Sequence, residues 1–348
     1  MKKTTVAIVG ASGYSGEELV NILLKHPKVE LTAVTSRQYA GKTIGEVFPK
    51  FASYPLAKRL KFIDPDPKTL ADLAQLVFLA LPHGVAATYA KPLIESGRKV
   101  IDLSADFRLK SPEIYKEFYG HDHPSPELLN IAVYGLPEIY REQILSAALI
   151  ASPGCYPTSI LIPLIPALKK NLLDTRQIII DSLSGVSGAG RKVEAGYLFC
   201  ECNESLRAYG IPKHRHLSEI EEQLSFAAGE KVIAQFTPHL VPVNRGILTT
   251  IYLTPAVNNP EKFLKELEET YKEFYADQPF VRVLGNSILP DTKNITGTNV
   301  VEFGWKFDPR TGRLIIVSAV DNLIKGAGGQ AVQSMNIICG FEQTDGLI

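Results

Sequence analysis

Hydrophobic positions in the first part of the chain alternate between short strand-like runs and helical spacings. Thr4–Gly10 is a β-branched run that ends in glycine, and Glu17–His26 then carries apolar residues at helical spacing. Further strands are predicted at Val29–Thr35, Leu76–Leu81, Lys99–Leu103 and Ala147–Ala151, with a helix at Val85–Ser96. This alternation predicts an α/β domain, a Rossmann-like doubly wound parallel sheet.

From about Gln177 the pattern changes to longer strands that follow one another. They are predicted at Gln177–Leu183, Val232–Val243, Ile247–Thr254, Val300–Phe307 and Leu314–Val320. Asp308–Arg313 supplies hairpin turn chemistry, and helical patterns at Ser218–Ala227 and Pro260–Ala276 flank the strands. The second domain is therefore expected to be α+β, with a mainly antiparallel sheet.

Composition favours two domains and a small-molecule partner. The 348 residues are 45% hydrophobic, which is enough for two cores, and 37 basic residues balance 37 acidic ones. No net charge draws the chain to nucleic acid or to an anionic membrane surface. The longest apolar runs are too short to span a bilayer, and a strand begins almost at Met1, so no targeting peptide is expected. With only four cysteines, a cytoplasmic setting fits best.

A glycine-rich turn joins the first strand to the first helix. Gly10-Ala-Ser-Gly13-Tyr-Ser-Gly16 is a variant of the dinucleotide-binding turn, in which backbone N–H groups approach a pyrophosphate at a helix N-terminus. The next strand ends in Thr35-Ser36-Arg37, where NAD sites usually carry an acidic residue. A hydroxyl and a guanidinium suit a 2′-phosphate, so NADPH is favoured over NADH. The alternative interpretation is that Arg37 is only a solvated loop residue without a role in binding. The predicted cofactor contacts in this region are Gly10, Ser12, Gly13, Tyr14, Ser15, Gly16, Ser36 and Arg37.

Cys155 is the candidate nucleophile. It stands in Ser152-Pro-Gly-Cys-Tyr-Pro-Thr158, between an apolar strand and the apolar helical run Ile160–Leu168. A cysteine at a helix N-terminus meets the positive end of the macrodipole, which favours the thiolate. The alternative is a buried structural cysteine, which the flanking proline and glycine make less attractive. Cys200 and Cys202 lack this context and have no second pair for a metal, so no metal is expected.

Together these motifs resemble N-acetyl-gamma-glutamyl-phosphate reductase of arginine biosynthesis. The further matches are Leu81-Pro-His-Gly84, Leu103-Ser-Ala-Asp-Phe-Arg108, Tyr134-Gly-Leu-Pro-Glu138, Ser184-Gly-Val-Ser-Gly-Ala-Gly-Arg191, His214-Arg-His216 and Lys325-Gly-Ala-Gly-Gly329. The resemblance implies an architecture like that of aspartate semialdehyde dehydrogenase, NADPH, and a catalytic cysteine that matches Cys155. Ser159 departs from the Gly or Ala that is more common there.

The resemblance also assigns roles to other residues. Arg108 matches the arginine that grips the substrate phosphate in semialdehyde dehydrogenases, and a guanidinium suits that task; its alternative is a surface ion pair. The related dehydrogenases carry their acid/base histidine after an RVPV-like strand, where this chain has Ile247, so His214 or His216 is expected to carry the proton, with His214 preferred. The remaining implied contacts are Ser184 and Arg191 to substrate, and Ser187, Gly188, Asn322 and Gly326 to cofactor.

The domains expected on this basis are an NADP-binding domain at 1–155, completed by a C-terminal helical segment at 322–348, and a catalytic and dimerisation domain at 156–321. In the predicted reaction, the Cys155 thiolate displaces phosphate to give a thioester, which is then reduced with NADPH to the semialdehyde. A homodimer or homotetramer is expected. Two alternatives stay open: the LysW-type aminoadipate phosphate reductase of lysine biosynthesis, and a non-catalytic NADPH-binding sensor.

Overall fold

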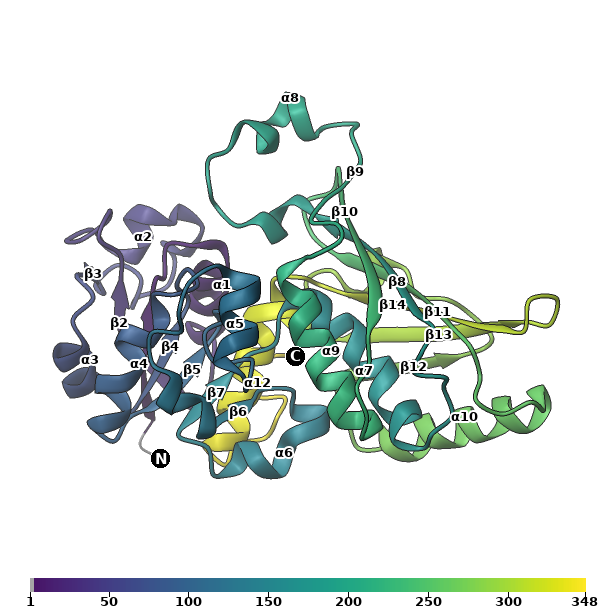
Figure 1. Cartoon of the computed structure of the whole chain (residues 1–348). Coiled ribbons are helices and arrows are strands. Elements are labelled where there is room, and N and C mark those ends of the chain that lie inside the picture. The colour runs from purple at the N-terminus through teal and green to yellow at the C-terminus, as the bar shows by residue number, and fades with distance from the viewer. Residues whose placement is uncertain (1–2) are drawn as a thin grey trace. The chain divides into compact units, whose positions relative to one another are not determined.

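The computed structural model describes residues 3–348, which form two compact units (Figure 1). Unit 1 comprises the chain up to Pro153 together with Ala327–Ile348, and unit 2 comprises Gly154–Gly326. The chain therefore passes from unit 1 to unit 2 immediately before Cys155 and returns immediately after Gly326. Each unit has its own sheet, and we describe the two separately.

Unit 1 is built on a seven-stranded parallel sheet in the order β3-β2-β1-β4-β5-β7-β6. Its strands are β1 (Thr4–Val9), β2 (Val29–Thr35), β3 (Phe62–Ile63), β4 (Leu76–Leu79), β5 (Lys99–Asp102), β6 (Ala132–Tyr134) and β7 (Leu149–Ala151). Its helices are α1 (Tyr14–Leu23), α2 (Ile44–Val47), α3 (Pro67–Leu73), α4 (Ala86–Glu95), α5 (Pro112–Tyr119), α6 (Pro137–Leu145) and α12 (Gly329–Ile338). Two separate apolar clusters form its core, as expected for a parallel sheet. The predicted doubly wound sheet is confirmed.

The turn between β1 and α1 requires glycine at two positions. Gly10 has φ +81°, and a Cβ there would lie 2.3 Å from the carbonyl oxygen of Ala80. A Cβ on Gly16 would lie 2.4 Å from the carbonyl oxygen of Gly10. Both approaches exclude any side chain, so the backbone turns tightly and α1 begins at Tyr14, three residues earlier than the apolar spacing predicts.

Helix α12 belongs to unit 1 although it comes from the C-terminal end of the chain. All ten of its residues are buried, and it packs against α6 and α1. Oδ1 of its Asn336 accepts a hydrogen bond from Nε2 of His26 at 3.0 Å, and Nδ2 of Asn336 donates to the carbonyl oxygens of Gln343 and Asp345. These polar contacts fix the last residues of the chain on unit 1.

Unit 2 contains a mixed seven-stranded sheet in the order β12-β13-β14-β11-β8-β10-β9. Its strands are β8 (Ile178–Gly185), β9 (Arg207–Ala208), β10 (Ala234–Val241), β11 (Ile247–Leu253), β12 (Val281–Gly285), β13 (Val301–Asp308) and β14 (Arg313–Val320). Its helices are α7 (Cys155–Lys169), α8 (Phe199–Cys202), α9 (Arg215–Ala228), α10 (Pro260–Phe274) and α11 (Thr292–Ile295). The β8–β10 and β12–β13 pairs are parallel and the other four are antiparallel, so the mainly antiparallel sheet is confirmed.

Helix α7 is almost entirely buried and contains two internal prolines, Pro163 and Pro166. Each proline lacks the N–H that would bond the carbonyl four residues earlier, which leaves the oxygens of Ser159 and Ile162 without their usual helical donors. The Ser318 hydroxyl donates to the Ser159 oxygen at 2.6 Å. The Tyr275 hydroxyl donates to the Ile162 oxygen. Side chains from β14 and from the end of α10 thus complete the hydrogen bonding that keeps α7 continuous.

Candidate active site

Cys155 is the first residue of α7, at the N-terminus of a helix of fifteen residues. Gly154 occupies the N-cap position with an extended backbone, and its carbonyl oxygen accepts a hydrogen bond from the Thr158 hydroxyl at 3.0 Å. The predicted place of the cysteine at a helix start is confirmed. The residue is partly exposed, and the helix dipole favours the thiolate there.

Two side chains of α9 converge on Gly154. A Cβ on Gly154 would lie 2.6 Å from Nε2 of His216, so the imidazole fits only because this residue is glycine. The Gly154 N–H donates to Oε1 of Glu219 at 2.8 Å, and Glu219 is 1% exposed. His216 and a buried carboxylate therefore both lie against the residue that precedes Cys155.

His214 has a different environment. It is the N-cap of α9, where its Nδ1 accepts a hydrogen bond from the His216 N–H at 3.1 Å. Its ring packs edge-on against four aromatic rings, with centroids 5.0 to 5.6 Å away: Tyr156, Tyr209, His216 and Phe236. Burial, with a smaller contribution from Arg215, lowers the pKa of His214 to about 4. The ring is therefore neutral near pH 7, with Nδ1 committed as an acceptor.

Tyr156 and Tyr209 form a hydroxyl pair beside these histidines. Their oxygens are 2.9 Å apart, and Ser184 hydrogen-bonds to Tyr156. Burial raises the pKa of Tyr209 to about 12, and it raises the pKa of Tyr156 as well. Both hydroxyls therefore keep their protons at neutral pH. Tyr209 and Glu219 were not among the sequence candidates; the position of Glu219 one helical turn after His216 is the sequence signal that could have found it.

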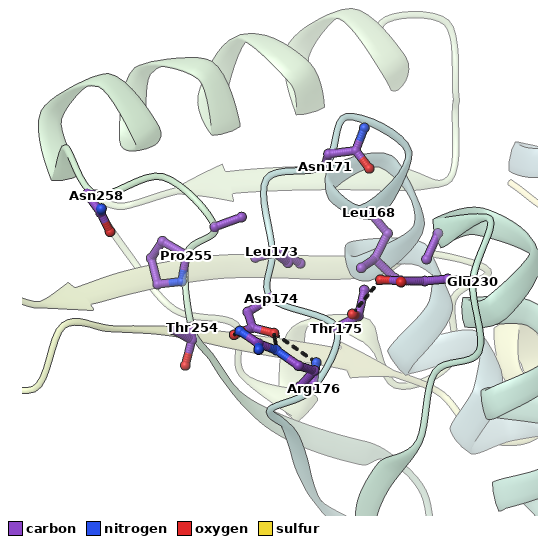
Figure 2. A pocket seen from close by; sticks show the side chains of 12 residues that line it. Leu168, Asn171, Leu173, Asp174, Thr175, Arg176, Glu230, Thr254, Pro255 and Asn258 are labelled. Carbon is purple, nitrogen blue, oxygen red and sulfur yellow. Dashed lines mark hydrogen bonds and ion pairs between the residues drawn. The ribbon is translucent and has the colours of Figure 1, made fainter.

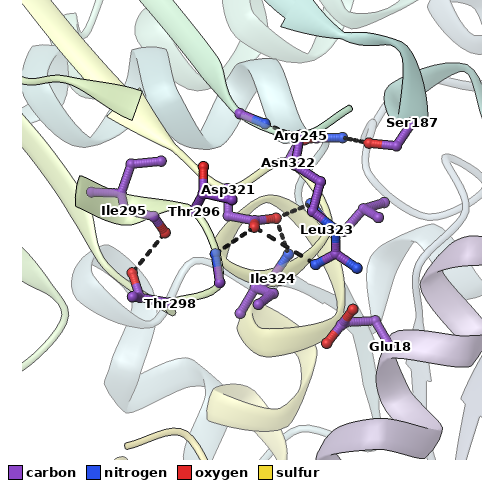
Figure 3. Close-up of polar contacts among 12 residues, drawn as sticks. Glu18, Ser187, Arg245, Ile295, Thr296, Thr298, Asp321, Asn322, Leu323 and Ile324 are labelled. Atoms are coloured by element: carbon purple, nitrogen blue, oxygen red, sulfur yellow. Dashed lines mark hydrogen bonds and ion pairs between the residues drawn. The ribbon is translucent and has the colours of Figure 1, made fainter. Parts of the chain in front are cut away.

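The loop that begins at Asp321, before the return to unit 1, makes polar contacts with other parts of unit 2 (Figure 3) and reaches Cys155 through Gly326. A Cβ on Gly326 would be 2.8 Å from the Cβ of Cys155. Asn322 donates to the Ser187 hydroxyl at 2.9 Å and accepts from the Gly246 N–H at 2.8 Å. These contacts bring together four of the residues predicted in unit 2, Ser184, Ser187, Gly188 and Asn322, while Gly326 lies against Cys155.

Asp321 organises the same loop. Its buried carboxylate accepts hydrogen bonds from the N–H groups of Leu323, Ile324 and Gly297, and Arg245 lies 3.7 Å from it. These bonds start the π-helical turn Ile324–Gly328, which carries Gly326. The buried charge therefore fixes the backbone next to the cysteine.

The glycine turn of unit 1 is held by hydroxyls at the end of β2. The Thr35 hydroxyl accepts from the Gly10 N–H at 3.2 Å, and the hydroxyls of Ser12 and Ser36 are 3.0 Å apart. Arg37 follows directly and is exposed. Gly13 is the N-cap of α1, ahead of Tyr14, Ser15 and Gly16, and it brings no side chain to cover the first N–H groups of the helix.

The two predicted substrate arginines differ in their surroundings. Arg108, in unit 1, is 6% exposed, and its guanidinium donates to the carbonyl oxygens of Ser152 at 2.8 Å and Leu103 at 2.9 Å. The position of its guanidinium is thereby fixed at the carboxyl end of the sheet. Arg191, in unit 2, is exposed and lies in the long segment between β8 and β9.

A cavity of about 580 Å³ lies elsewhere in unit 2 (Figure 2). Its lining includes two hydrogen-bonded pairs, Arg176 with Asp174 and Thr175 with Glu230. None of the predicted site residues lines this cavity. Within residues 3–348 no cluster of His, Cys, Asp and Glu has the arrangement of a metal site. In the same range, no helix is long and apolar enough to cross a membrane.

Comparison with known proteins defines the class first. Residues 5–147 match the family model of the semialdehyde dehydrogenase NAD binding domain, and residues 155–322 match that of the semialdehyde dehydrogenase dimerisation domain. Aspartate semialdehyde dehydrogenase II from Vibrio cholerae, solved with ASA, has the same fold, with a TM-score of 0.73 and 16% identity over 98% of this chain and 99% of that one. Aspartate semialdehyde dehydrogenase from Candida albicans, solved with NADP, has a TM-score of 0.73 and 17% sequence identity over 97% of this chain and 98% of that one. The fold and its two domains are those of a nicotinamide-dependent oxidoreductase of the semialdehyde dehydrogenase class.

Closer relatives narrow this class to a family. A protein of Akkermansia muciniphila named N-acetyl-gamma-glutamyl-phosphate reductase is 58% identical over 100% of this chain and 99% of its own length. A protein of the same name from Pelobacter propionicus is 52% identical over 98% of this chain and 97% of its own length. The chain belongs to the N-acetyl-gamma-glutamyl-phosphate reductase family. The resemblance found in the sequence is confirmed, as is the prediction of a reductase with a nicotinamide cofactor.

Proposed function

We propose that this enzyme reduces N-acetyl-gamma-glutamyl phosphate to N-acetylglutamate semialdehyde and phosphate with NADPH, in arginine biosynthesis, through a thioester on Cys155. The names of relatives that match along the whole chain support the substrate. The single observation that carries the mechanism is the partly exposed cysteine at the first position of α7. A cytoplasmic homo-oligomer is part of the proposal, and the dimerisation-domain match supports association.

The residues of the glycine turn fit a dinucleotide. Gly10 and Gly16 bring the backbone into a tight turn, and the N-cap Gly13 makes no side-chain cap bond, so the first N–H groups of α1 suit a pyrophosphate. Ser36 and the exposed Arg37 at the end of β2 would hold a 2′-phosphate, with Ser12 hydrogen-bonded to Ser36. In unit 2, Ser187, Gly188, Asn322 and Gly326 would contact the same cofactor. When bound, NADPH supplies the hydride that reduces the thioester carbon.

Cys155 performs the covalent step. Its thiolate attacks the acyl carbon, a C–S bond forms, and the bond from that carbon to the phosphate oxygen breaks, so that phosphate leaves with the electron pair. The N–H groups of the first turn of α7 point toward the thiol end of the helix, where they are placed to stabilise the developing oxyanion. After reduction the C–S bond breaks with its electron pair on sulfur, which releases the aldehyde and regenerates the Cys155 thiolate.

We propose His216 as the proton carrier, which reverses the preference drawn from the sequence. His216 lies against Gly154, whereas His214 has its Nδ1 bonded to the His216 N–H and a pKa lowered to about 4. A group with that pKa is almost fully deprotonated at neutral pH and is poorly matched to acid catalysis. His214 then serves to start α9 and to orient its neighbour.

Arg108, Ser184 and Arg191 are proposed to bind substrate. The fixed guanidinium of Arg108 suits a phosphate, because a guanidinium presents parallel donors to two oxygens. Ser184, in unit 2, contributes a hydroxyl that is hydrogen-bonded to the Tyr156 side chain. Arg191 is exposed on the β8–β9 segment, from which it would meet the substrate carboxylate.

The test is the reaction run in reverse, with N-acetylglutamate semialdehyde, phosphate and NADP, on the wild type and on Cys155→Ser. We expect turnover to vanish in the variant while NADPH affinity stays within about twofold, since nucleophile and dinucleotide site are chemically separate. Mass spectrometry of iodoacetamide-treated enzyme should find Cys155 labelled before Cys200, Cys202 or Cys339. Substantial residual turnover would exclude the covalent route, and activity only with the aminoadipate semialdehyde would instead support the lysine-pathway alternative.

A further inference from the structure

We propose that Asp102 is a neutral carboxylic acid in the working enzyme and that its proton sets the strength of the anion site at Arg108: when Asp102 ionises, phosphate binds more weakly. This inference rests on the proposed function, in which Arg108 binds the phosphate group. It follows from an unequal pair of buried carboxyl groups in one loop of unit 1, those of Asp102 and Asp106, both of which are 0% exposed.

Asp102 and Arg108 are joined through Ser152. The Ser152 N–H donates to the Asp102 carbonyl oxygen at 2.8 Å, and the Ser152 carbonyl oxygen accepts from Nε of Arg108 at 2.8 Å. Arg108 also donates to the carbonyl oxygen of Leu103, the residue after Asp102. The loop therefore folds back on itself, and the Asp102 carboxyl group lies close enough to the guanidinium to feel its charge.

Asp106 has the contacts of an ionised carboxylate. Its Oδ1 accepts hydrogen bonds from the Gly84 N–H at 2.6 Å and from the Tyr115 hydroxyl at 3.0 Å, and its Oδ2 accepts from the Ala87 N–H at 3.1 Å. Gly84 and Ala87 lie at the N-terminal end of α4, where the helix dipole favours a negative charge. Three donors and a helix start together stabilise the ionised form of Asp106.

The Asp102 carboxyl group bonds to one residue, Ser104, among those that the structure describes. Its Oδ1 accepts the Ser104 N–H at 2.9 Å, and its Oδ2 lies 2.7 Å from the Ser104 hydroxyl oxygen. A protonated carboxyl group also fits the second contact, because a hydroxyl oxygen can accept the acid proton. When two buried carboxyl groups share a site, one of them holds its proton, and here it is the one with fewer donors. Burial, and then the charge of Asp106, raise the pKa of Asp102 to about 7.

The aromatic and imidazole groups around this loop are neutral. His83 and His123 each accept a backbone N–H at Nδ1, which leaves one proton on each ring, at Nε2. Burial raises the pKa of Tyr115, so its hydroxyl keeps its proton. None of these groups supplies a positive charge that would stabilise a second carboxylate.

The elements that pack against β5 bring no further charge to its carboxyl end. Within the described residues, strands β4 and β7 and helix α12 contain no Asp, Glu, Lys, Arg or His. Lys91 and Glu95 of α4 are exposed, and Lys99, at the opposite end of β5, donates to the Ile338 carbonyl oxygen. Arg108 is therefore the positive charge that an ionised Asp102 would meet.

Ionisation of Asp102 changes the charge that an incoming anion experiences. With the proton in place, the charges of Asp106 and Arg108 sum to zero. Without it, the loop carries one net negative charge beside the guanidinium, which opposes a bound anion. By linkage, an anion on Arg108 raises the pKa of Asp102, and a coupling of one unit corresponds to about a tenfold loss of anion affinity as Asp102 ionises.

The experiment uses sulfate as the probe, because sulfate stays a dianion across the working pH range and only the protein titrates. Its affinity is measured as competitive inhibition against phosphate in the reverse reaction, and as the rise in melting temperature, which needs no turnover. The variants are Asp102→Asn and, as the matched control in the same loop, Asp106→Asn. At 102, asparagine copies the neutral acid, since its amide can donate to the Ser104 hydroxyl oxygen. At 106, the same change places an amide against a backbone N–H donor.

We expect the sulfate affinity of the wild type to fall about tenfold as the pH rises from about 6 to about 8.5, and that of Asp102→Asn to stay constant. Asp106→Asn should keep the titration and move it to lower pH, because the neighbouring charge is gone. Folded Asp102 holds its proton up to about pH 7, whereas the unfolded chain loses it near a pKa of about 3.9. The stability of the wild type relative to Asp102→Asn should therefore decline as the pH rises from about 5 to about 7.

Equal pH dependence of sulfate affinity in the wild type and Asp102→Asn, or a constant difference in their stabilities, overturns the proposal. If Asp102→Asn does not fold, an infrared titration of the wild type decides. A carboxylic acid band that disappears near pH 7 supports the proposal, and the absence of such a band above about pH 6 overturns it. Retained turnover in Cys155→Ser would refute the proposed function and leave the sulfate and stability results standing.

Discussion

Gly326 and Cys155 touch across unit 2: a Cβ on Gly326 would lie 2.8 Å from the Cβ and 3.2 Å from the Cα of the cysteine. The glycine sits in the π-helical turn that Asp321 starts, so its backbone has little freedom to withdraw. Cys155, on the other side of the contact, belongs to the first turn of the buried helix α7. Neither partner is the end of a flexible side chain, and one added methyl group must displace one backbone or the other.

We therefore expect Gly326→Ala to lower turnover by about 10²-fold, since a displacement of about 1 Å at a reacting group has effects of that size. Overpacking should also cost about 1 to 3 kcal/mol of stability. Steady-state kinetics and urea unfolding measure the two effects. Gly196→Ala is the control, because a Cβ there meets the flexible Arg207 side chain at 3.1 Å. Normal turnover in Gly326→Ala would show that the contact yields without moving the thiol.

Cofactor choice should depend on Arg37. Only NADPH carries the 2′-phosphate, and a charge-assisted contact is worth about 1.5 to 3 kcal/mol, so Arg37→Ala should reduce the preference for NADPH over NADH by about tenfold or more. Fluorescence titration with both cofactors measures this ratio. Arg141→Ala, an exposed arginine on α6 whose nearest carboxylate is 4.0 Å away, should leave the ratio unchanged. Equal losses of both affinities in Arg37→Ala would mean that Arg37 does not bind the 2′-phosphate.

Arg108→Lys tests the phosphate site. Lysine keeps the charge but loses the planar fork, so the KM for phosphate in the reverse reaction should rise about tenfold while NADPH affinity holds. Stability should also fall, since one ammonium cannot replace the bonds to both Ser152 and Leu103. Lys110→Met is a matched control, because Lys110 also donates to two backbone carbonyls, those of Leu129 and Ala132. It should lose stability without a change in KM, and an unchanged phosphate KM in Arg108→Lys would mean that the arginine is only structural.

The pKa of His214 predicts a pH dependence of stability. Its folded value, about 4, lies below the unfolded value of about 6.5, so the unfolded chain binds the proton more readily. The contribution of His214 to stability is therefore complete above about pH 6.5 and declines as the pH falls toward 4. His214→Asn keeps a good N-cap and removes this slope. Urea unfolding of both proteins at pH 7, 6 and 5 measures the difference, and parallel curves would contradict the assignment.

Patterns that repeat along the chain were enough to predict much of the fold. The alternation of strands and helices in unit 1 and the longer strands of unit 2 each predicted the observed sheet. The strands β3, β6, β9 and β12 were missed because they are short or only half-buried, so that little apolar periodicity marks them. The apolar run that marks α7 in the sequence starts only at Ile160, because the first turn of the helix, from Cys155, contains a proline and polar residues that hydrophobic periodicity does not register.

The candidate site was predictable where chemistry and position coincide in a short motif. Cys155 and the glycine turn carry their own local signals, a helix start in one case and a strand-to-helix turn in the other. The choice between His214 and His216 depended on which ring faces Gly154, which is set by how α9 packs on α7. Tyr209 meets Tyr156 from a position 53 residues away in the chain, a pairing that no local pattern contains.

Because of the two internal prolines of α7, Pro163 and Pro166, the effect of a substitution at one position depends on the residue at another that is distant in the chain. With Pro166 present, the Ile162 carbonyl oxygen depends on the Tyr275 hydroxyl for its hydrogen bond, so Tyr275→Phe alone leaves a buried acceptor without a donor. With an ordinary residue at 166, the helix supplies its own donor and the hydroxyl becomes dispensable. The same holds for Pro163 and Ser318 through the Ser159 oxygen. Each pair is therefore epistatic: the proline must be replaced before its hydroxyl partner is lost, and lineages that took the steps in the other order would have passed through a weakened enzyme.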